Sequence, residues 1–236
     1  MIYITTICSE IADNINYQKI INEIECNTKD NDKVIVITSA PTIVLEQLVI
    51  DMLKQNIDDK DQIELLALKE QETACHFYIN LKRQNIPSVI LYPHQIPIIA
   101  STNEIEYVEL MNILSKLVNH KYVIIPGNFG ITKYLNNMFY GSNQTYKLGV
   151  YIYDKIKSKK LKVQLHIYTK ADGIMLYDEF NNITKTKLDQ IKKDEIRNIR
   201  STLDQVLDSK TLDKVINKQI ELSIGNKFLD GTKIIT

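Results

Sequence analysis

The strongest constraint in this sequence is a repeated alternation of short apolar strands with amphipathic helices. Residues 1–7 (MIYITTI) and 33–38 (KVIVIT) are β-branched runs of strand length, and residues 16–26 between them repeat their apolar side chains at helical spacing. The turn Ser39-Ala40-Pro41-Thr42 then opens a second apolar-faced helix. A strand, a turn and a helix in this order form the unit from which parallel sheets are built.

The same unit recurs along the rest of the chain. We expect helices over residues 71–84 and 143–157 and over VELMNILSKLVNH, and strands at SVILY, at residues 122–125 and at VQLHIYT. This order predicts an α/β fold, a three-layer sandwich with a mostly parallel central sheet between helices. No repeat or linker divides the chain, so residues 1–236 are expected to form a single domain with a change of lobe near residue 125 (lobes of about 1–125 and 126–236). Ligands of such sheets bind beyond the carboxyl ends of the strands.

Charge and composition exclude several classes of partner. The chain has 29 Lys+Arg against 29 Asp+Glu, so no net charge attracts nucleic acid or an anionic membrane. No segment approaches the roughly 18 apolar residues of a membrane span, and no signal peptide is recognisable, so we expect a cytoplasmic protein. The three cysteines, Cys8, Cys26 and Cys75, are widely spaced and are expected to be reduced.

Several segments carry a family resemblance through their order along the chain. They are VIVITSAPT, KEQETACHFYINLKRQNIPSVIL, YPHQIPIIAS, VIIPGNFGIT, HIYTKADGIM and KVINKQIELSIGNKFLDGTKI. Together they resemble the amino acid kinase family, and within it the catalytic domain of aspartokinases, over nearly the whole chain. No residues remain for the regulatory domains that follow in many aspartokinases. The resemblance implies transfer of the γ-phosphoryl group of ATP, with Mg²⁺, to the β-carboxylate of aspartate, a step of amino-acid biosynthesis.

The resemblance also implies a substrate side. Glu70 and Thr73 fall on the Glu and the last Ser of a Ser-x-Gly-Glu-x-x-Ser motif, and Gln95 falls on the Gln of a Gly-x-Gln-Ala-Gly turn. These three residues are the implied contacts of an amino-acid carboxylate substrate. We place Glu70 and Thr73 at the start of a helix, where the alternative interpretation is an N-terminal cap.

A nucleotide side is implied in the second half of the chain. Thr169, Asp172 and Gly173 agree with the family's Ile-Tyr-Thr-Asp-Val-Asp-Gly-Val, and Gly141 and Ser142 match part of its Gly-Gly-Ser-Asp. The alternative for the first motif is a tight turn that needs Asp-Gly.

The sequence departs from the family where phosphate is bound. The family's Lys-Phe-Gly-Gly-Thr-Ser is replaced by Ile-Thr-Thr-Ile-Cys-Ser, with Thr5 near the Lys, and Asn143 replaces the Asp of Gly-Gly-Ser-Asp. Lys170 stands where the nucleotide motif has its first Asp. Losing one such group costs on the order of 100 to 1000-fold in rate, so the catalytic group is unknown unless Lys170 or Lys133 supplies the missing cation.

Three further interpretations stay open. One is a non-catalytic paralogue that acts as a binding or regulatory subunit, paired with a complete kinase. Another is a kinase for a different acid. The third, a Cys–His nucleophile such as Cys75 with His94, has no supporting motif. The family also implies a homodimer, formed through helices that flank the sheet.

Overall fold

The fold was obtained as a computed structural model of the whole chain. It describes residues 1–8, 16–101, 104–139, 144–177, 183–192, 195–196, 199, 203 and 207–235. Gly141, Ser142 and Asn143 lie outside these described residues.

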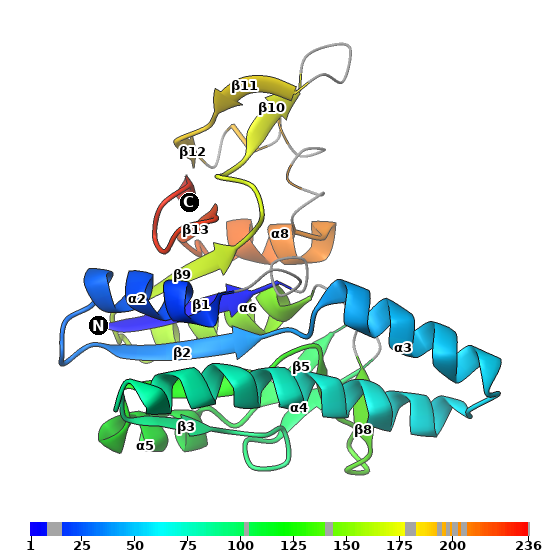
Figure 1. Cartoon of the computed structure of the whole chain (residues 1–236). Coiled ribbons are helices and arrows are strands. Elements are labelled where there is room, and N and C mark those ends of the chain that lie inside the picture. The colour runs from blue at the N-terminus through cyan, green and yellow to red at the C-terminus, as the bar shows by residue number, and fades with distance from the viewer. Residues whose placement is uncertain are drawn as a thin grey trace.

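A sheet of eight strands forms the centre of the molecule (Figure 1). Its order is β12-β14-β13-β9-β1-β2-β6-β3, and every described pair of neighbours is parallel except β13 with β14. The strands are β1 (Ile2–Ile7), β2 (Lys33–Thr38), β3 (Ser88–Ile90), β6 (Tyr122–Pro126), β9 (Val163–Tyr168), β12 (Gln190–Lys192), β13 (Leu222–Gly225) and β14 (Thr232–Ile235). The predicted α/β class with a mostly parallel sheet is confirmed.

Helices cover both faces of this sheet. They are α2 (Tyr17–Asn27), α3 (Thr42–Lys54), α4 (Asp59–Arg83), α5 (Leu110–Asn119), α6 (Thr145–Ser158) and α8 (Ser209–Asn217). Alternate residues of each strand point to opposite faces. Tyr3 and Val34 therefore pack in one core with α2 and α4, whereas Ile4 and Ile35 pack in another with α5, α6 and α8. The result is the predicted three-layer arrangement.

A second, small sheet was not predicted from the sequence. Its order is β5-β4-β7-β8, formed by β4 (Ile98–Ala100), β5 (Ile105–Val108), β7 (Phe129–Ile131) and β8 (Asn137–Phe139). A separate hairpin pairs β10 (Met175–Tyr177) with β11 (Ile183–Lys187). Because β7 follows β6 directly and pairs with β4, the small sheet joins segments on both sides of residue 125. The proposed lobe boundary there stays a prediction.

The start of α4 corrects one expectation. We expected a helix over residues 71–84 that begins near Glu70 and Thr73, but α4 begins at Asp59. The Asp58 side chain caps it by accepting a hydrogen bond from the Asp61 amide, and acidic side chains in the first turn favour the helix dipole. Glu70 and Thr73 therefore lie in the middle of α4 on its buried face, and the expectation that they begin or cap a helix was wrong.

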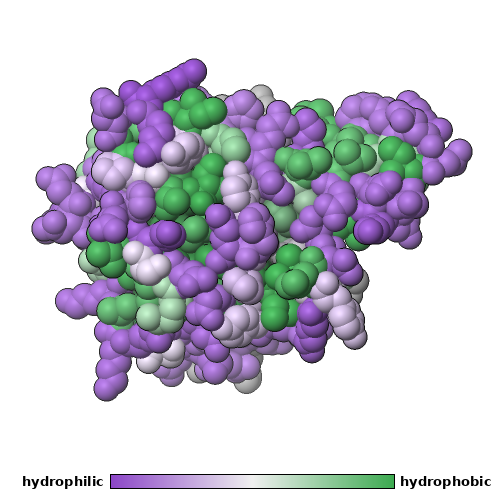
Figure 2. Space-filling view, turned by 90° about the horizontal axis from the view of Figure 1, so that it is seen from below, coloured by the Kyte–Doolittle hydropathy of each residue, from purple (hydrophilic) through white to green (hydrophobic). Residues whose placement is uncertain are grey.

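Helix α3 and the amino-terminal part of α4 project from the body of the molecule as an antiparallel arm, while the rest of α4 packs on the main sheet (Figure 1). Viewed from below, apolar side chains lie in separate patches among polar ones on the body and on this arm (Figure 2). Within the described part of the chain, no helix has the length and apolar character needed to cross a membrane.

Candidate functional site

The carboxyl ends of β1, β2 and β6 and the beginning of α6 meet at one edge of the main sheet. The parallel register brings Thr38, the last residue of β2, beside Pro126, the last residue of β6. Gly127 then turns back and donates its amide to the carbonyl of Thr38 at 2.7 Å. An ideal β-carbon on Gly127 would lie 2.4 Å from Cγ2 of Thr145, so only glycine lets α6 begin this close to the strand ends.

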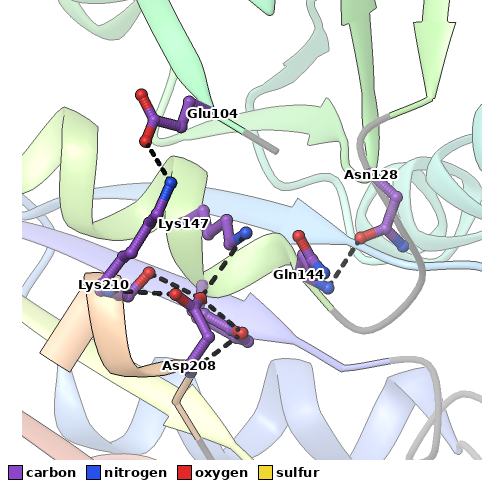
Figure 3. A network of polar contacts seen from close by, with 8 residues as sticks. Glu104, Asn128, Gln144, Lys147, Asp208 and Lys210 are labelled. Carbon is purple, nitrogen blue, oxygen red and sulfur yellow. Dashed lines mark hydrogen bonds and ion pairs between the residues drawn. The ribbon is translucent and has the colours of Figure 1, made fainter. Parts of the chain in front are cut away.

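Glu70 reaches this edge from α4 and is fully buried. Its Oε2 accepts a hydrogen bond from the Ala40 amide at 2.9 Å, and its Oε1 accepts one from Nδ2 of Asn128 at 2.8 Å. Nδ2 of Asn128 also donates to Oγ of Ser39 at 2.5 Å, and its Oδ1 accepts from the Gln144 amide at 3.0 Å. The Asn128–Gln144 contact is visible in Figure 3. One carboxyl group thus joins the loops after β2 and β6 to the beginning of α6.

The protonation of Glu70 follows from its burial. Burial raises the pKa of Glu70 to about 8, and the hydrogen bonds from Asn128, Ala40 and Ser39 only partly oppose this rise. The carboxyl group is therefore mostly neutral at pH 7. A neutral carboxylic acid inside a polar network attracts the ammonium group of a ligand less strongly than an exposed carboxylate does.

The other two predicted substrate contacts are engaged locally. Oγ1 of Thr73 donates to the carbonyl of Lys69 one turn earlier in α4, at 3.1 Å. Gln95 is exposed, and its Oε1 accepts from the Tyr92 amide at 2.9 Å, which closes its own turn. Among the described residues the structure brings Glu70 and Thr73 together on one helix face but gives Gln95 no hydrogen bond to either.

Unpartnered hydroxyl groups gather at the strand ends, and the sequence reasoning missed them. The side-chain oxygens of Thr6, Thr38 and Thr145 are buried and have no hydrogen-bond partner within the described part of the chain. Thr5, expected near the lost Lys, has a buried and unpartnered hydroxyl as well. Buried hydroxyl groups without partners are uncommon and call for an explanation, such as a ligand. The available sequence signal was a threonine in the last two residues of β1 and of β2, Thr6 and Thr38.

Helix α6 begins at the same place. Its N-cap residue, Gln144, makes no side-chain capping hydrogen bond. The first amide groups of a helix have no partner inside the helix and carry the positive end of its dipole. The beginning of α6, with the hydroxyl group of Thr145 in its first turn, therefore has the chemistry of an anion site. Thr6 and Thr38 point to opposite faces of the sheet, Thr6 with Ile4 and Thr38 with Val34 and Val36.

The predicted nucleotide residues follow β9. The Thr169 amide donates to the carbonyl of Gly225 at 2.9 Å, and its Oγ1 donates to the carbonyl of Ala171 at 3.0 Å. Asp172 is exposed and pairs with Lys187 at 3.6 Å. Gly173 has a φ of +147°, and a β-carbon there would lie 2.7 Å from Oγ1 of Thr232. Asp172 and Gly173 thus form a tight turn, which was the alternative to a nucleotide site, and their contact with a nucleotide stays a prediction.

The two candidate replacement cations differ. Lys170 is exposed beside this turn, and its role as a replacement cation stays a prediction. Lys133 is paired with Glu106 at 3.3 Å. No group of three or more His, Cys, Asp or Glu side chains suited to a metal ion occurs in the part of the chain that the structure describes.

The other residues weighed from the sequence have local roles. Within the described part of the chain no disulfide joins Cys8, Cys26 and Cys75. Sγ of Cys75 lies 3.6 Å from the hydroxyl of Tyr92, and the Tyr92 ring stacks on His94. His166 is buried, with its Nδ1 2.7 Å from Oγ of Ser223, and burial lowers its pKa to about 3.

Comparison with solved structures identifies the fold. No family model and no curated protein sequence matches the chain. The aspartate kinase of Synechocystis is similar over 100% of this chain, with a TM-score of 0.79 and 19% identity. Aspartokinase III of E. coli, solved with aspartate and ADP, has a TM-score of 0.73 and 13% identity over 100% of this chain. The uridylate kinase of Archaeoglobus fulgidus has a TM-score of 0.65 and 12% identity over 99% of this chain.

The lengths of these proteins differ. The chain spans 40% of the Synechocystis protein and 65% of the E. coli one, but 99% of the uridylate kinase. The fold is that of amino acid kinases, as the sequence resemblance predicted. At these identities the likeness concerns the fold alone, and the neighbours include kinases named for different substrates.

Proposed function

We propose that this chain is an aspartokinase-like phosphotransferase that binds ATP at the carboxyl edge of its main sheet and phosphorylates an amino-acid carboxylate, with aspartate as the first candidate. The observation that carries the proposal is the beginning of α6 at the carboxyl edge of the sheet, where the N-cap residue makes no side-chain capping hydrogen bond and the hydroxyl group of Thr145 is buried without a partner among the described residues. Phosphate oxygens accept hydrogen bonds from both kinds of donor.

The chain's own groups would divide the work as follows. The first amides of α6 and the hydroxyl group of Thr145 hold phosphate oxygens, and the ammonium group of Lys170 offsets their charge from the end of β9. Mg²⁺ neutralises phosphate charge when bound. Without an acidic cluster among the described residues, the ion would be held mainly by the phosphates and by water, as is common for Mg²⁺. An acceptor carboxylate oxygen attacks the γ-phosphorus in line, so an acyl phosphate forms and ADP leaves.

A second candidate, the non-catalytic binding or regulatory subunit, is favoured by one specific contact. Asn128 already donates to Glu70, the residue that the resemblance assigns to substrate. An amino-acid ammonium group would have to displace this amide. If it cannot, the chain keeps the nucleotide site without the acceptor site.

The first experiment is calorimetric titration of the purified chain with ATP in the presence of Mg²⁺. We expect micromolar binding, and about tenfold weaker binding in Thr145→Val, which removes the hydroxyl group at constant shape. Thr28→Val is the matched control, because its hydroxyl is also buried and unpartnered but follows α2 at the amino edge of the sheet. Absence of binding at millimolar ATP would remove the proposal.

A second experiment separates the two candidates. Acyl phosphate formed from aspartate is trapped as a hydroxamate while ADP is measured. Equal amounts of both support the phosphotransferase. ATP binding without product from any amino-acid carboxylate supports the non-catalytic subunit, which is then tested by its effect on the rate of a complete aspartokinase.

A further inference from the structure

A separate cavity of about 190 Å³ lies between α6, α8 and β5, on the face of the sheet that these helices cover. Its walls carry three lysines, Lys147 from the first turn of α6 and Lys210 and Lys214 from α8. Glu104, Asp208 and Tyr151 complete the polar lining. Figure 3 shows Lys147, Lys210 and both carboxylates converging from three segments far apart in the sequence.

The lysines outnumber the carboxylates. Lys147 pairs with Asp208 at 3.6 Å, and Lys210 pairs with Glu104 at 3.0 Å. Within the described residues Lys214 has no ion pair. Its ammonium group lies 4.7 Å from the centre of the Tyr151 ring, and burial lowers its pKa. The carboxylates of Asp154 and Glu104 favour its charged form from beyond ion-pair distance. A half-buried cation without an ion pair gains more from an anion than an exposed lysine does.

Asp208 also accepts hydrogen bonds from its own helix α8 and from α6. Its Oδ1 accepts from the Thr211 amide at 3.1 Å, and its Oδ2 accepts from Oγ1 of Thr211 at 2.8 Å and from the hydroxyl of Tyr146 at 3.0 Å. Although burial alone would raise it, these hydrogen bonds and Lys147 hold the pKa of Asp208 below its usual value. Asp208 is therefore a carboxylate that keeps its negative charge, and the three lysines of the lining exceed its two carboxylates by one charge.

The size of the cavity limits the ligand. Pockets for drug-sized molecules have volumes of about 300–1,000 Å³, so a cavity of about 190 Å³ suits something smaller than a nucleotide. We propose that this cavity binds a small dianion, a phosphate group or a short dicarboxylate, between Lys147, Lys210 and Lys214. The shared chemistry is two negative charges on oxygen atoms within one small molecule.

This site does not require the proposed function. It does touch the same helix, because Lys147 stands in the first turn of α6. A dianion that draws Lys147 away from Asp208 changes the charge beside the beginning of α6. The ligand is therefore suited to act as an effector of whatever binds at the strand ends.

The test is calorimetric titration of the full chain with inorganic phosphate, and separately with malonate, at constant low ionic strength. We expect one equivalent to bind, and the Lys214→Met variant, which keeps the apolar stem, to bind at least about tenfold more weakly. Lys218→Met is the control, since this exposed lysine follows the same helix and does not line the cavity; it should change the affinity less than about twofold. Saturation by phosphate alone identifies a phosphate-bearing ligand, whereas saturation by malonate too extends the site to dicarboxylates.

Three results would overturn the proposal. The first is no saturation of the wild type by either anion up to about 20 mM, well beyond the affinity of a useful site. The second is unchanged binding in a folded Lys214→Met. The third is phosphate binding that is lost in Thr145→Val but kept in Lys214→Met, which would place the ion at the beginning of α6. If ATP does not bind but inorganic phosphate binds and this binding depends on Lys214, the proposed function is removed and the dianion site remains.

Discussion

Asn128 decides how the carboxyl edge of the sheet is held together. It has a φ of +60°, a left-handed conformation that asparagine tolerates better than most residues. In this conformation its side-chain amide donates to Glu70 and Ser39 and accepts a hydrogen bond from the Gln144 backbone amide. One side chain thus fixes α4, β2 and α6 relative to one another. It also occupies the place where a donor group of a ligand would meet Glu70.

Glu70 should make stability depend on pH. A carboxyl group with its pKa raised from 4.5 to about 8 keeps, in the folded protein, a proton that the unfolded chain has lost, so stability falls as pH rises across this interval. The limiting slope is about 1.4 kcal/mol per pH unit. We expect urea unfolding at pH 5, 6, 7 and 8 to show the wild type losing stability relative to Glu70→Gln. Parallel curves would show that Glu70 is ionised in the folded state.

Two variants separate the roles of Asn128. Asn128→Gly keeps the backbone conformation but leaves Glu70 and the Gln144 amide without a partner, at an expected cost of about 1 to 3 kcal/mol in the free energy of unfolding. Asn128→Ala adds the left-handed strain of a β-carbon, about 1 kcal/mol more. Denaturant midpoints measure both. Equal stability of the Gly and Ala variants would argue against the strain, and wild-type stability of both would argue against the network.

Helix α6 is the element that links the site to the sheet, and Gly149 allows its close approach. An ideal β-carbon on Gly149 would lie 2.6 Å from Cγ2 of Thr6 in β1 and 3.2 Å from Cδ1 of Leu165 in β9. Glycine inside a helix lowers the stability of the helix. At this position it allows α6 to contact the two central strands, β1 and β9. The contact carries the beginning of α6 to the strand ends.

A double-mutant cycle tests this contact. Gly149→Ala should gain about 1 kcal/mol of helix propensity but lose about 1 to 3 kcal/mol by overpacking, for a net destabilisation. Thr6→Ser removes the clashing methyl group. In that background the Ala substitution should cost less, with a coupling free energy of about 1 kcal/mol or more from denaturant unfolding. Additive effects would show that α6 accommodates the methyl group by shifting.

Sequence periodicity located the main elements because long, buried segments carry a strong pattern. Residues 33–38 were predicted as a strand and form β2, and the helix expected over 143–157 is α6, Thr145–Ser158. The small sheet was missed because strands of three or four residues are too short to show an alternation. The first half of α4 was missed although Asp58 provides a cap signal.

The candidate site was predicted less well, for a physical reason. The resemblance pointed to Glu70, which does lie at the strand ends. The sequence cannot show that the carboxyl group of Glu70 already accepts a hydrogen bond from Asn128. Such contacts join residues far apart in the chain and depend on side-chain direction. Gln95 also matches a family position, but its side chain accepts a hydrogen bond from the Tyr92 amide within its own turn and does not reach Glu70. The lysine cavity had no motif, since its residues come from three separate segments.

At the scale of the whole molecule, the proposed nucleotide site and the proposed dianion site lie at different places around α6. A ligand that binds only the folded state raises stability by about 2.7 kcal/mol at 100 times its dissociation constant. We therefore expect ATP with Mg²⁺ and inorganic phosphate each to raise the melting temperature. The two shifts should be additive if the sites are independent. A phosphate shift that vanishes at saturating ATP would show that the two ligands share one site.

The projecting arm gives the predicted homodimer a surface. Ile43, Ile50 and Leu53 of α3 are 66%, 46% and 62% exposed, which is unusual for three apolar residues on one helix. We expect the chain to sediment as a dimer and Leu53→Glu to shift it toward monomer, with Gln55→Glu at an exposed position as a control of equal charge change. A wild type that sediments only as a monomer would remove the prediction.

The strand order of the main sheet has a consequence for how the chain is made. β1 has β2 on one side and β9 on the other, and β9 comes about 160 residues after β1. At a ribosome speed of about 5 to 20 residues per second, one edge of β1 stays open for roughly 8 to 30 s after its synthesis. During that time its unpaired backbone amide and carbonyl groups can pair with another nascent chain. Slow translation between β6 and β9, or lack of a chaperone, should therefore lower the yield of this protein more than its final stability suggests.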